Sequence, residues 1–345
     1  MSKLKLPTDY RPALDVLTTE KAIKRFKDYF EVALADELYL QRVTAPVVVL
    51  SGLGINDDLN GMERPVSFAI RDMGERRAEV VHSLAKWKRM KLAALHMQPG
   101  RGIYTDMNAL RPDEELTNLH SVYVDQWDWE VAIKPTDRHI EYLKRTVKRI
   151  YRVFKRAEEN ISKEFPVLKK RLPAFITFIH AEELRQRYPD LSPKDREDLI
   201  AREHGAVFII GVGGALADGS VHDGRAADYD DWITETAPGF RGLNGDIIFW
   251  HQELEQAFEV SSMGIRVNQG ALLEQLALRN ESHKKGLLYH QMLLQGRLPL
   301  SIGGGIGQSR TCMFVLQKVH IGEVQAGIWP DEMLASCSKA GIALL

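Results

Sequence analysis

Residues 120–130 read His-Ser-Val-Tyr-Val-Asp-Gln-Trp-Asp-Trp-Glu, a stretch in which aromatic and polar side chains alternate. A period of two is typical of a β-strand, because successive side chains point to opposite faces of the sheet. The alternation divides the strand into two sets: Asp125, Trp127 and Trp129 on one face, and Gln126, Asp128 and Glu130 on the other. The polar set suits the floor of a site for a small polar ligand, although the alternation alone favours a half-exposed sheet with its polar face in water.

Strand patterns recur on both sides of this stretch, which we predict to run as a strand over residues 120–132. The others cover residues 43–50, 66–71, 103–110, 174–180, 207–212, 246–250 and 257–267. Several of these strands follow one another without a helix between them, which favours an antiparallel sheet. The strand at 43–50 contains Pro46, which cannot donate a hydrogen bond to a neighbouring strand, so this strand should lie at an edge or an interface.

Helical spacing of apolar residues predicts helices before, between and after these strands. The first begins near Thr18 and Thr19, either of which can cap it, and its apolar stripe consists of Ile23, Phe26, Phe30 and Leu34. The remaining helices are expected at residues 84–94, 137–163, 192–203, 270–294 and 308–319. We therefore predict an α+β fold in which helices flank a central, mostly antiparallel sheet, as a single domain over residues 1–345 with an N-terminal extension at 1–15.

The composition narrows the class of protein. Lys and Arg number 46 and Asp and Glu 47, so the near-neutral chain has no electrostatic basis for non-specific binding of nucleic acid. Its two cysteines, Cys312 and Cys337, are too few for a disulfide scaffold and fit a reducing compartment. The apolar runs have the length of strands, and the N-terminus lacks the apolar region of a signal peptide. We expect a cytoplasmic protein with no membrane partner.

Arg111 follows the predicted strand at 103–110 and begins the loop to the next strand. An arginine in that position can hold a phosphate or a carboxylate with two parallel hydrogen bonds. A surface arginine paired with Asp113 or Glu114 is the better interpretation of this motif when it is taken alone, because exposed charges are the norm.

Residues 301–310 read Ser-Ile-Gly-Gly-Gly-Ile-Gly-Gln-Ser-Arg and lead into a predicted helix. Glycines let a backbone approach a ligand closely, and the N-terminus of a helix favours anions. The run lacks the Gly-Lys-Ser/Thr of a phosphate-binding Walker loop and the βαβ surroundings of a dinucleotide loop. Arg310 opposes the dipole in the first turn of the helix, which indicates an arginine that faces a ligand. A tight strand-to-helix turn explains the glycines equally well.

Two carboxylates fall on the strands predicted at 246–250 and 257–267. If these strands form a hairpin centred near residues 252–253, Asp246 faces Glu259, and two carboxylates directly opposite one another repel. A magnesium ion that bridges them to a triphosphate would remove the repulsion, whereas a frayed hairpin with solvated acids would not need it. Glu259 and Arg266 have opposite parity, so a bulge near Gly264 is required to bring both to one face.

Three further charged segments give weaker evidence for a ligand site. In the helix at 84–94, Lys88 can hold a substrate carboxylate, although a basic surface helix is the better interpretation on spacing alone. The acidic segments at 56–61 and 228–232 are most simply turns, but a carboxylate in either can hold an ammonium group.

Taken together, these motifs resemble a known family. The Pro46 strand after a helix, Arg111 after a strand, and Gly305-x-Gly307-x-x-Arg310 at the start of a helix occur in the order of the three motifs of class II aminoacyl-tRNA synthetases. The closer resemblance is to the ammonia-dependent asparagine synthetases, or aspartate–ammonia ligases, over roughly residues 20 to 330. The segments that carry it are 82–89, 110–114, 120–130, 228–232, 261–267, 302–310 and 324–330.

The resemblance implies a homodimeric, class II synthetase-like enzyme that uses ATP and Mg²⁺. It would make L-asparagine from L-aspartate and ammonia through β-aspartyl-AMP, with AMP and diphosphate as products. By resemblance, the catalytic residues are Asp57, Arg111, Gln126 and Arg310. The aspartate site would comprise Ser83, Lys88, Gln126, Asp128, Asp230 and Arg266. The nucleotide would contact Arg111, Glu259, Gly305, Gly307 and Arg310, and the metal Asp246, Glu259 and Ser262.

Two rival functions are less well supported. A tRNA synthetase would need an anticodon-binding barrel, and the ~40 residues before Pro46 are too few for one. A catalytically silent amino-acid sensor would be expected to lack a motif arginine or the acidic pair, and all of these are present. Free ammonia rather than glutamine is the expected nitrogen donor. Cys312 lies in an apolar stretch and Cys337 lies beyond every motif, and neither has a neighbouring histidine to activate it for attack on an amide.

Overall fold

The computed structural model describes residues 4–57 and 63–345. Its centre is an eight-stranded sheet in which two neighbouring pairs at the edges are parallel and the other pairs are antiparallel. This confirms the predicted α+β class. In spatial order the strands are β1 (Leu40–Arg42), β5 (Gly102–Leu110), β6 (Tyr123–Ala132), β13 (Ser301–Gly307), β12 (Gln256–Ile265), β11 (Asn244–His251), β8 (Ala206–Ile210) and β7 (Thr177–His180).

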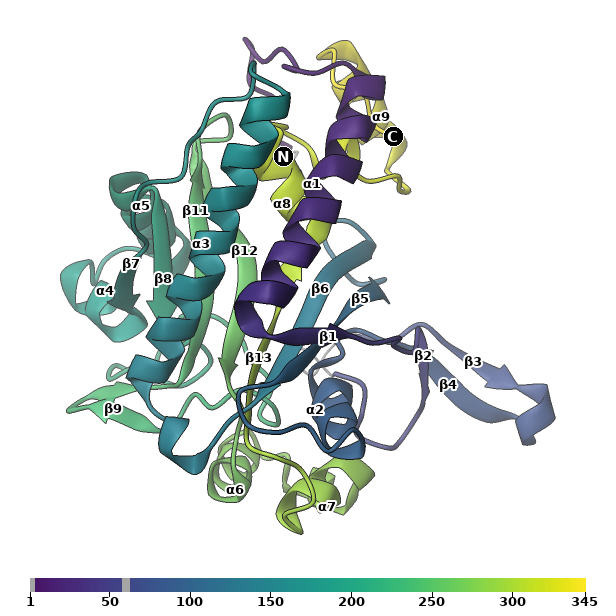
Figure 1. Ribbon diagram of the computed structural model, residues 1–345, viewed down its shortest axis with the longest axis vertical. Helices are drawn as coiled ribbons and strands as arrows, with labels where there is room; N and C mark the ends of the chain where they lie inside the picture. Colours follow the sequence, from purple (N-terminus) through teal and green to yellow (C-terminus); the bar gives the residue numbers. More distant parts are fainter. Residues whose placement is uncertain (1–3, 58–62) are drawn as a thin grey trace.

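Helices cover both faces of this sheet (Figure 1). The first face packs against α1 (Val16–Leu38), α3 (Ile140–Glu164) and α8 (Gln308–Val315). The second face packs against α2 (Ala85–Ala94) near β5 and β6, and against α4 (Ala181–Arg187) and α5 (Pro193–His204) near β7 and β8. Among the described residues, no helix is both long enough and apolar enough to cross a membrane.

Smaller elements surround the sheet. A three-stranded arm projects from one side of the molecule and consists of β3 (Ser67–Ile70), β4 (Arg76–Val80) and β2 (Val48–Leu50). The remaining elements are the two-stranded ribbon of β9 (Glu235–Ala237) and β10 (Phe240–Arg241), and helices α6 (Gln269–Leu278), α7 (Leu288–Leu294) and α9 (Asp331–Lys339). Of these, the sequence pattern missed β4, β9, β10 and α9, which are short or rich in charged residues.

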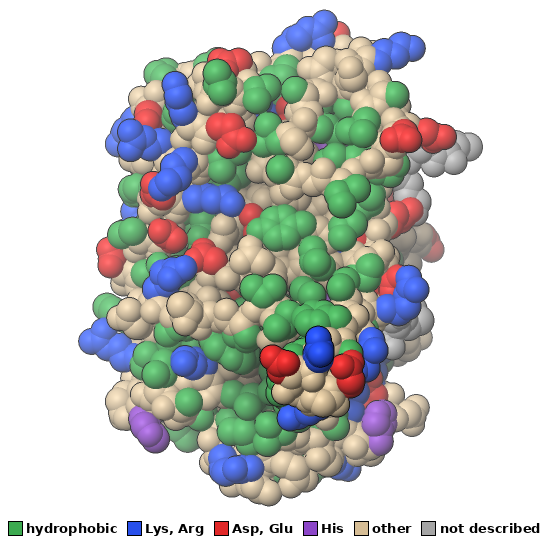
Figure 2. Space-filling view, turned by 90° about the vertical axis from the view of Figure 1, so that its right-hand side faces the viewer, with side chains coloured by type: hydrophobic (Ala, Val, Ile, Leu, Met, Phe, Trp, Pro, Cys, Tyr) green, Lys and Arg blue, Asp and Glu red, His purple; other side chains and the backbone are tan. Residues whose placement is uncertain are grey.

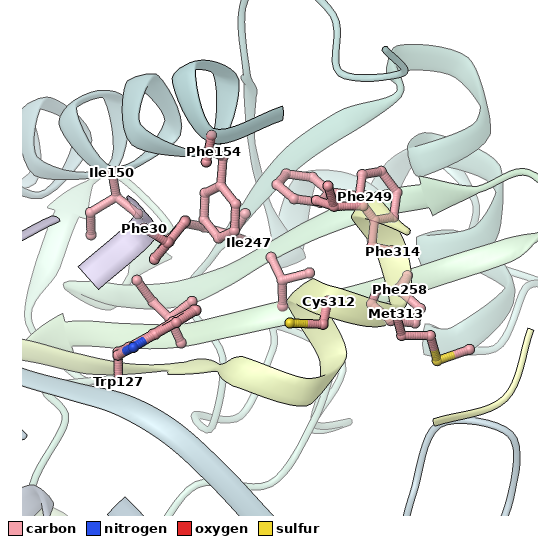
Figure 3. Close-up of a cluster of buried hydrophobic side chains, with 14 of the residues drawn as sticks. Phe30, Trp127, Ile150, Phe154, Ile247, Phe249, Phe258, Cys312, Met313 and Phe314 are labelled. Atoms are coloured by element: carbon pink, nitrogen blue, oxygen red, sulfur yellow. The ribbon is translucent and has the colours of Figure 1, made fainter. Parts of the chain in front are cut away.

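The core lies between the first face and its helices (Figure 3). Phe30 of α1 stacks on Trp127 of β6 with ring centroids 4.5 Å apart, and its ring also meets Phe154 of α3 at 5.0 Å. Phe249 continues the cluster from Phe154 toward α8. Such packed aromatic rings bury much apolar area and prefer these offset or tilted contacts. Trp127 therefore faces the core, as the alternation predicted, and the polar residues of β6 face the opposite side.

Helix α1 begins earlier than we predicted. Asp15, not Thr18 or Thr19, is its N-cap, and the Asp15 carboxylate accepts a hydrogen bond from the Thr18 amide at 2.9 Å. A carboxylate there satisfies a free N–H and favours the helix dipole. Thr19 instead donates its hydroxyl to the Asp15 carbonyl at 2.7 Å.

The predicted strand at 43–50 is largely wrong: only β2, at Val48–Leu50, falls within it, and β1 precedes it at Leu40–Arg42 in the other sheet. Pro46 lies between β1 and β2, where the chain leaves the main sheet for the arm. Both strands lie at an edge of their sheets, as the proline required, because it cannot donate to a ladder on either side.

The glycine run forms β13, a central strand that passes directly into α8. We predicted no strand there, although a strand-to-helix turn was one of our two interpretations of these glycines. A β-carbon on Gly303 would lie 1.9 Å from the Glu130 carboxylate, and one on Gly305 would lie 2.1 Å from the Gln126 amide oxygen. Glycine is required here because side chains of the neighbouring strand occupy the space above it.

The long helix predicted at 270–294 is interrupted. Helix α6 ends at Leu278, a short 3₁₀ turn covers Ser282–Gly286, and α7 begins at Leu288. Asn280 between them has φ 57°, a left-handed conformation that asparagine tolerates better than most residues and that commonly ends helices.

Replacing Phe30 tests the core. Phe30→Ala should lower the free energy of unfolding by about 3–5 kcal/mol, because burial is lost and a cavity remains. Urea denaturation followed by tryptophan fluorescence measures the change. Leu17→Ala is the control from the same helix, since Leu17 is 74% exposed, and it should change stability by less than ~0.5 kcal/mol. Equal losses in the two variants would contradict this packing.

Candidate active site

A cavity of about 350 Å³ opens on the second face of the sheet, away from α1 and α3. Side chains from β6, β12 and β13 line it, together with the loop after β5 and a segment near residue 225. Seven of the predicted site residues line this cavity: Arg111, Gln126, Glu259, Ser262, Gly305, Gly307 and Arg310. The other predicted residues lie beneath it or beside it: Asp57, Ser83, Lys88, Asp128, Asp230, Asp246 and Arg266.

Arg111 enters the cavity from the end of β5. Its Nη2 donates to the His82 carbonyl at 3.3 Å, and its Nη1 lies 3.8 Å from the Glu114 carboxylate. Among the described residues, Nε has no hydrogen-bond partner although it is buried. The pairing with Glu114 is therefore long, and the guanidinium keeps donors that an anion in the cavity can use.

Arg310 lies in the first turn of α8. Its Nη1 donates to the Glu259 carbonyl at 3.3 Å and lies 3.5 Å from the Glu259 carboxylate. The helix start also carries an anion, because Asp125 accepts a hydrogen bond from the Ser309 amide at 2.9 Å. Lys27 of α1 lies 3.0 Å from the same carboxylate. Asp125 thus offsets the unfavourable placement of a cation at a helix N-terminus and holds that turn in position.

The hairpin of β11 and β12 has another register than we predicted. Asp246 pairs with Ser262 and not with Glu259, which lies opposite Ile248. A four-residue turn at 252–255, with Glu255 at φ 47°, shifts the register by two residues relative to the expected hairpin, and a bulge farther along β12 shifts it by one more at Asp246. The direct opposition of the two carboxylates was therefore a wrong prediction.

A bulge nevertheless brings Glu259 and Arg266 to one face. It lies at Val260, where the register shifts, rather than near Gly264. The core-facing residues of β12 change parity across it: Phe258 and Val260 before the bulge, Met263 and Ile265 after it. Glu259 and Ser262 consequently both face the cavity.

The two carboxylates at this end differ in their surroundings. Burial raises the pKa of Asp246, and the nearby negative charge of Glu259 raises it further, against the effect of Arg225. Burial also acts to raise the pKa of Glu259, but Arg310 and Arg225 outweigh it and hold that pKa below its ordinary value. Two carboxylates and the Ser262 hydroxyl form an oxygen donor set that suits Mg²⁺, which binds few protein ligands and completes its shell with phosphate and water.

A network of buried charges forms the floor beneath the cavity. Lys88 contacts the Asp128 carboxylate and lies 3.9 Å from Glu130, while it also donates to the Trp129 carbonyl at 3.0 Å. Arg266 contacts Glu130 at 2.8 Å and Asp230. None of these side chains is more than 4% exposed. The polar face of β6 is therefore not in water, which decides against the half-exposed sheet.

This network has three carboxylates and two cations, so it carries one excess negative charge when all members are ionised. Burial raises the pKa of Asp128 and of Asp230 despite their cationic partners. In the part of the chain that the structure describes, the second oxygen of Asp128, Oδ2, accepts no hydrogen bond. A buried carboxylate oxygen without a partner is costly and favours the approach of a cation.

Asp57 and Ser83 lie on the α2 side of the site. Asp57 is buried, and its carbonyl contacts the His82 ring at 3.1 Å. Burial, together with the negative charge of Asp57, raises the pKa of Tyr229, which lines the cavity. Ser83 accepts a hydrogen bond from the Ala85 amide at the start of α2. The rest of the first acidic segment, residues 58–61, lies outside the described residues.

The second acidic segment divides its carboxylates among three partners. Asp230 contacts Arg266 in the floor, Asp231 contacts Arg138, and Asp228 lies 2.9 Å from Lys86 and 3.0 Å from His290. It is a set of buried ion pairs rather than a solvated turn.

Sequence reasoning assigned no role to three residues of the site. Glu130 belongs to the polar face of β6 and could have been assigned from the alternation alone. His120 lines the cavity, and burial together with Arg310 lowers its pKa to about 3, so its ring is neutral near pH 7. Arg225 lines the cavity from an irregular segment, where no periodicity marks it.

Comparison with known proteins identifies the family to which the chain belongs. A sequence model of the aspartate–ammonia ligase family matches residues 17–341. The chain is 56% identical over 345 residues to an aspartate–ammonia ligase of Bacteroides fragilis, with both chains fully covered. It is 53% identical to the enzyme of that name from Clostridium perfringens, again over 345 residues and the whole of both chains.

The fold is similar to that of class II aminoacyl-tRNA synthetases. An asparaginyl-tRNA synthetase from Pyrococcus horikoshii, complexed with asparaginyl-adenylate, superposes with a TM-score of 0.67 at 16% identity, covering 91% of this chain and 70% of that one. An aspartyl-tRNA synthetase from Entamoeba histolytica gives a TM-score of 0.61 at 13% identity, covering 89% and 58%. The architecture, the assembled cavity and the identity over the whole length agree, and this chain belongs to the aspartate–ammonia ligase family of enzymes.

Proposed function

We propose that this enzyme makes L-asparagine from L-aspartate and ammonia in two steps. The β-carboxylate of aspartate attacks the α-phosphorus of ATP, the bond to the β-phosphate breaks, and diphosphate leaves. Ammonia then attacks the β-carbonyl carbon of the aspartyl-AMP, loses one proton to a base, and AMP departs with the electrons of the C–O bond.

One observation carries this proposal. A single cavity has arginines that can bind phosphate on its walls, and beneath its floor lies a buried ionic network of three carboxylates and two cations. Such a site can hold an amino acid by its ammonium group and a nucleotide by its phosphates at the same time. Adenylation requires that both be present together in one orientation.

Arg111 and Arg310 are the residues that we assign to the α-phosphate. Negative charge builds on its oxygens as the carboxylate attacks, and positioned guanidinium groups stabilise that charge. Both arginines have donors directed at the cavity and neither is locked into a close ion pair. Gly305 and Gly307 contribute by the absence of side chains, which leaves room above β13 for the nucleotide.

Aspartate is proposed to lie over Gln126, with its ammonium group toward Asp128 and Asp230. The ammonium would supply the cation that the network lacks. Lys88 and Arg266 already hold these carboxylates, so we assign them to the aspartate site as positioning residues. Ser83, whose oxygen accepts from Ala85, keeps a hydroxyl proton that can be donated to a substrate carboxylate.

Magnesium would be held by Asp246, Glu259 and Ser262, whose oxygens lie at the β11 side of the cavity. When bound, the ion would neutralise phosphate charge and assist the departure of diphosphate. For the second step we assign Asp57 to the ammonium ion, which must lose a proton before its nitrogen can attack.

We further propose that neither tRNA nor glutamine takes part. The net charge of −1 gives no attraction to tRNA. Glutamine would require a reactive thiolate, whereas both cysteines are buried and burial raises the pKa of Cys312 to about 12. Two free cysteines also fit an enzyme that works in the reducing cytoplasm.

Pyrophosphate exchange tests the function. With ATP and magnesium, labelled pyrophosphate should enter ATP when L-aspartate is present, without tRNA and without ammonium. Asparagine should form on addition of ammonium chloride but poorly with glutamine. Exchange that needs tRNA, or efficient use of glutamine, would contradict the proposal.

Variants of Arg111 locate the reaction in this cavity. Arg111→Ala should lower the exchange rate by on the order of 10²–10³ because a transition-state donor is lost. Arg111→Lys should keep only part of the wild-type exchange rate, since an ammonium group cannot form the two parallel hydrogen bonds of a guanidinium. Arg187→Ala, which removes an exposed arginine paired with Glu183 on α4, is the control and should exchange at the wild-type rate.

We propose that the active protein is a homodimer. Among the described residues, β1 and β2 are the end strands of their sheets, and exposed apolar side chains lie along this side of the chain: Tyr39, Val47, Val48 and Phe68. Figure 2 looks onto this side, where hydrophobic side chains gather across the middle. An uncovered edge beside apolar surface favours symmetric pairing of two chains.

Light scattering tests the dimer. At micromolar concentration the mass should be twice the 39.1 kDa of one chain. Val48→Asp should lower the measured mass toward that of one chain, because a carboxylate would be buried at the interface. Val167→Asp, at a more exposed site outside the edge strands, should leave the mass unchanged. A wild-type protein with the mass of one chain would refute the proposal.

A further inference from the structure

Arg225 faces the cavity from the segment between β8 and β9, and one of its nitrogens, Nη2, contacts the Asp246 carboxylate. Its Nη1 donates to the Gly224 carbonyl at 2.7 Å and lies 3.4 Å from Asp223. Among the described residues, its Nε is buried without a hydrogen-bond partner. A guanidinium that is only 11% exposed thus stands beside the carboxylates assigned to magnesium.

The backbone of Arg225 is held while its guanidinium can exchange partners. A β-carbon on Gly213 would lie 2.6 Å from the Arg225 β-carbon, so the two segments are packed tightly. Arg279 donates to the Gly213 carbonyl at 2.9 Å and fixes that segment in turn. The long side chain beyond the β-carbon has rotatable bonds, and its guanidinium is held by Asp246 and by the Gly224 carbonyl.

Electrostatic forces determine which partner the Arg225 guanidinium takes when a nucleotide enters the cavity. A divalent cation that binds Asp246 repels the guanidinium on the same carboxylate. The phosphates that accompany the ion offer a new anionic partner, and a guanidinium fork matches phosphate oxygens well. Arg225 approaches from the β11 side of the cavity, whereas Arg111 approaches from β5, four strand positions away. The two arginines therefore reach the cavity from different sides, so a nucleotide between them can offer each a different phosphate.

We propose that Arg225 is a further nucleotide-binding residue, which neutralises Asp246 in the free enzyme and contacts the phosphates beyond the α-phosphate when ATP and magnesium enter. This inference rests on the proposed function, because an ATP-using site is what brings such phosphates to Asp246. The magnesium carboxylate is then never left without a cation, in the free enzyme or in the complex.

Calorimetric binding of two nucleotides tests the phosphate contact. α,β-Methylene-ATP has all three phosphates but cannot react at the α-phosphate, and AMP has only the first. With magnesium present, Arg225→Ala should lower the affinity for α,β-methylene-ATP by on the order of 10- to 100-fold and the affinity for AMP by less than ~3-fold. This is the pattern expected when charge-assisted hydrogen bonds to the outer phosphates are lost. Arg225→Lys keeps the positive charge beside Asp246 and should show a smaller loss.

Arg138→Ala is the matched control. Arg138 contacts Asp231 as Arg225 contacts Asp246, its side chain is 12% exposed, and it does not line the cavity. Its loss should leave both nucleotide affinities unchanged. A comparable loss in this variant, or equal losses for AMP and α,β-methylene-ATP in Arg225→Ala, would mean that Arg225 is merely structural.

Metal binding without nucleotide tests the other half of the proposal. Mn²⁺, followed by electron paramagnetic resonance, should bind Arg225→Ala several-fold more tightly than the wild type, because Asp246 no longer has a competing cation. Asp246→Asn in the same background should abolish that gain. Unchanged Mn²⁺ and α,β-methylene-ATP affinities in Arg225→Ala would overturn the inference alone. A wild-type enzyme that binds no α,β-methylene-ATP would overturn the proposed function and this inference with it.

Discussion

The site depends on charges buried in the middle of a sheet. Lys88, Asp128, Glu130, Asp230 and Arg266 hold one another beneath the cavity, nearly without exposure to solvent. Charges can be buried in this way only when they are paired and hydrogen-bonded, and removing one member leaves its partner uncompensated. The glycines of β13 follow from the same constraint, because the carboxylate of Glu130 and the amide of Gln126 occupy the space where side chains of that strand would stand. The glycine run thus makes room for the polar floor and, above it, for a substrate.

The opposite face of the sheet keeps this floor in place. Trp127 stacks on Phe30, and its neighbours in β6 point their polar groups the other way. Asp125 links the two faces, since it accepts from Ser309 at the start of α8 and pairs with Lys27 of α1. The position of Arg310 therefore depends on a carboxylate on the core side of the same strand that carries the floor. A single strand, β6, organises both the packing and the chemistry.

The sequence predicted the structure correctly where a feature depends on residues that are close together in the chain. The alternation in residues 123–130 assigned both faces of β6 correctly, because a strand flanked by two others has no freedom to turn over. The β11–β12 register could not be predicted, since it depends on the turn at Glu255 and on a bulge at Val260 that no glycine marks. The glycine strand was missed because its glycines make room for side chains on a neighbouring strand nearly 180 residues earlier. Arg225 was missed for a similar reason: its partner Asp246 is specified by the fold and not by spacing.

The central claim is that the ammonium group of aspartate supplies the cation that the buried network lacks. Succinate has the two carboxylates of aspartate without the ammonium group, so calorimetric titration with each ligand isolates that charge. The wild type should bind succinate at least ~100-fold more weakly than L-aspartate, because a buried carboxylate would be left unpaired. In Asp128→Asn, where the excess charge is removed, the preference should fall below ~10-fold. Succinate that binds the wild type as well as aspartate does, or an undiminished preference in Asp128→Asn, would contradict the account.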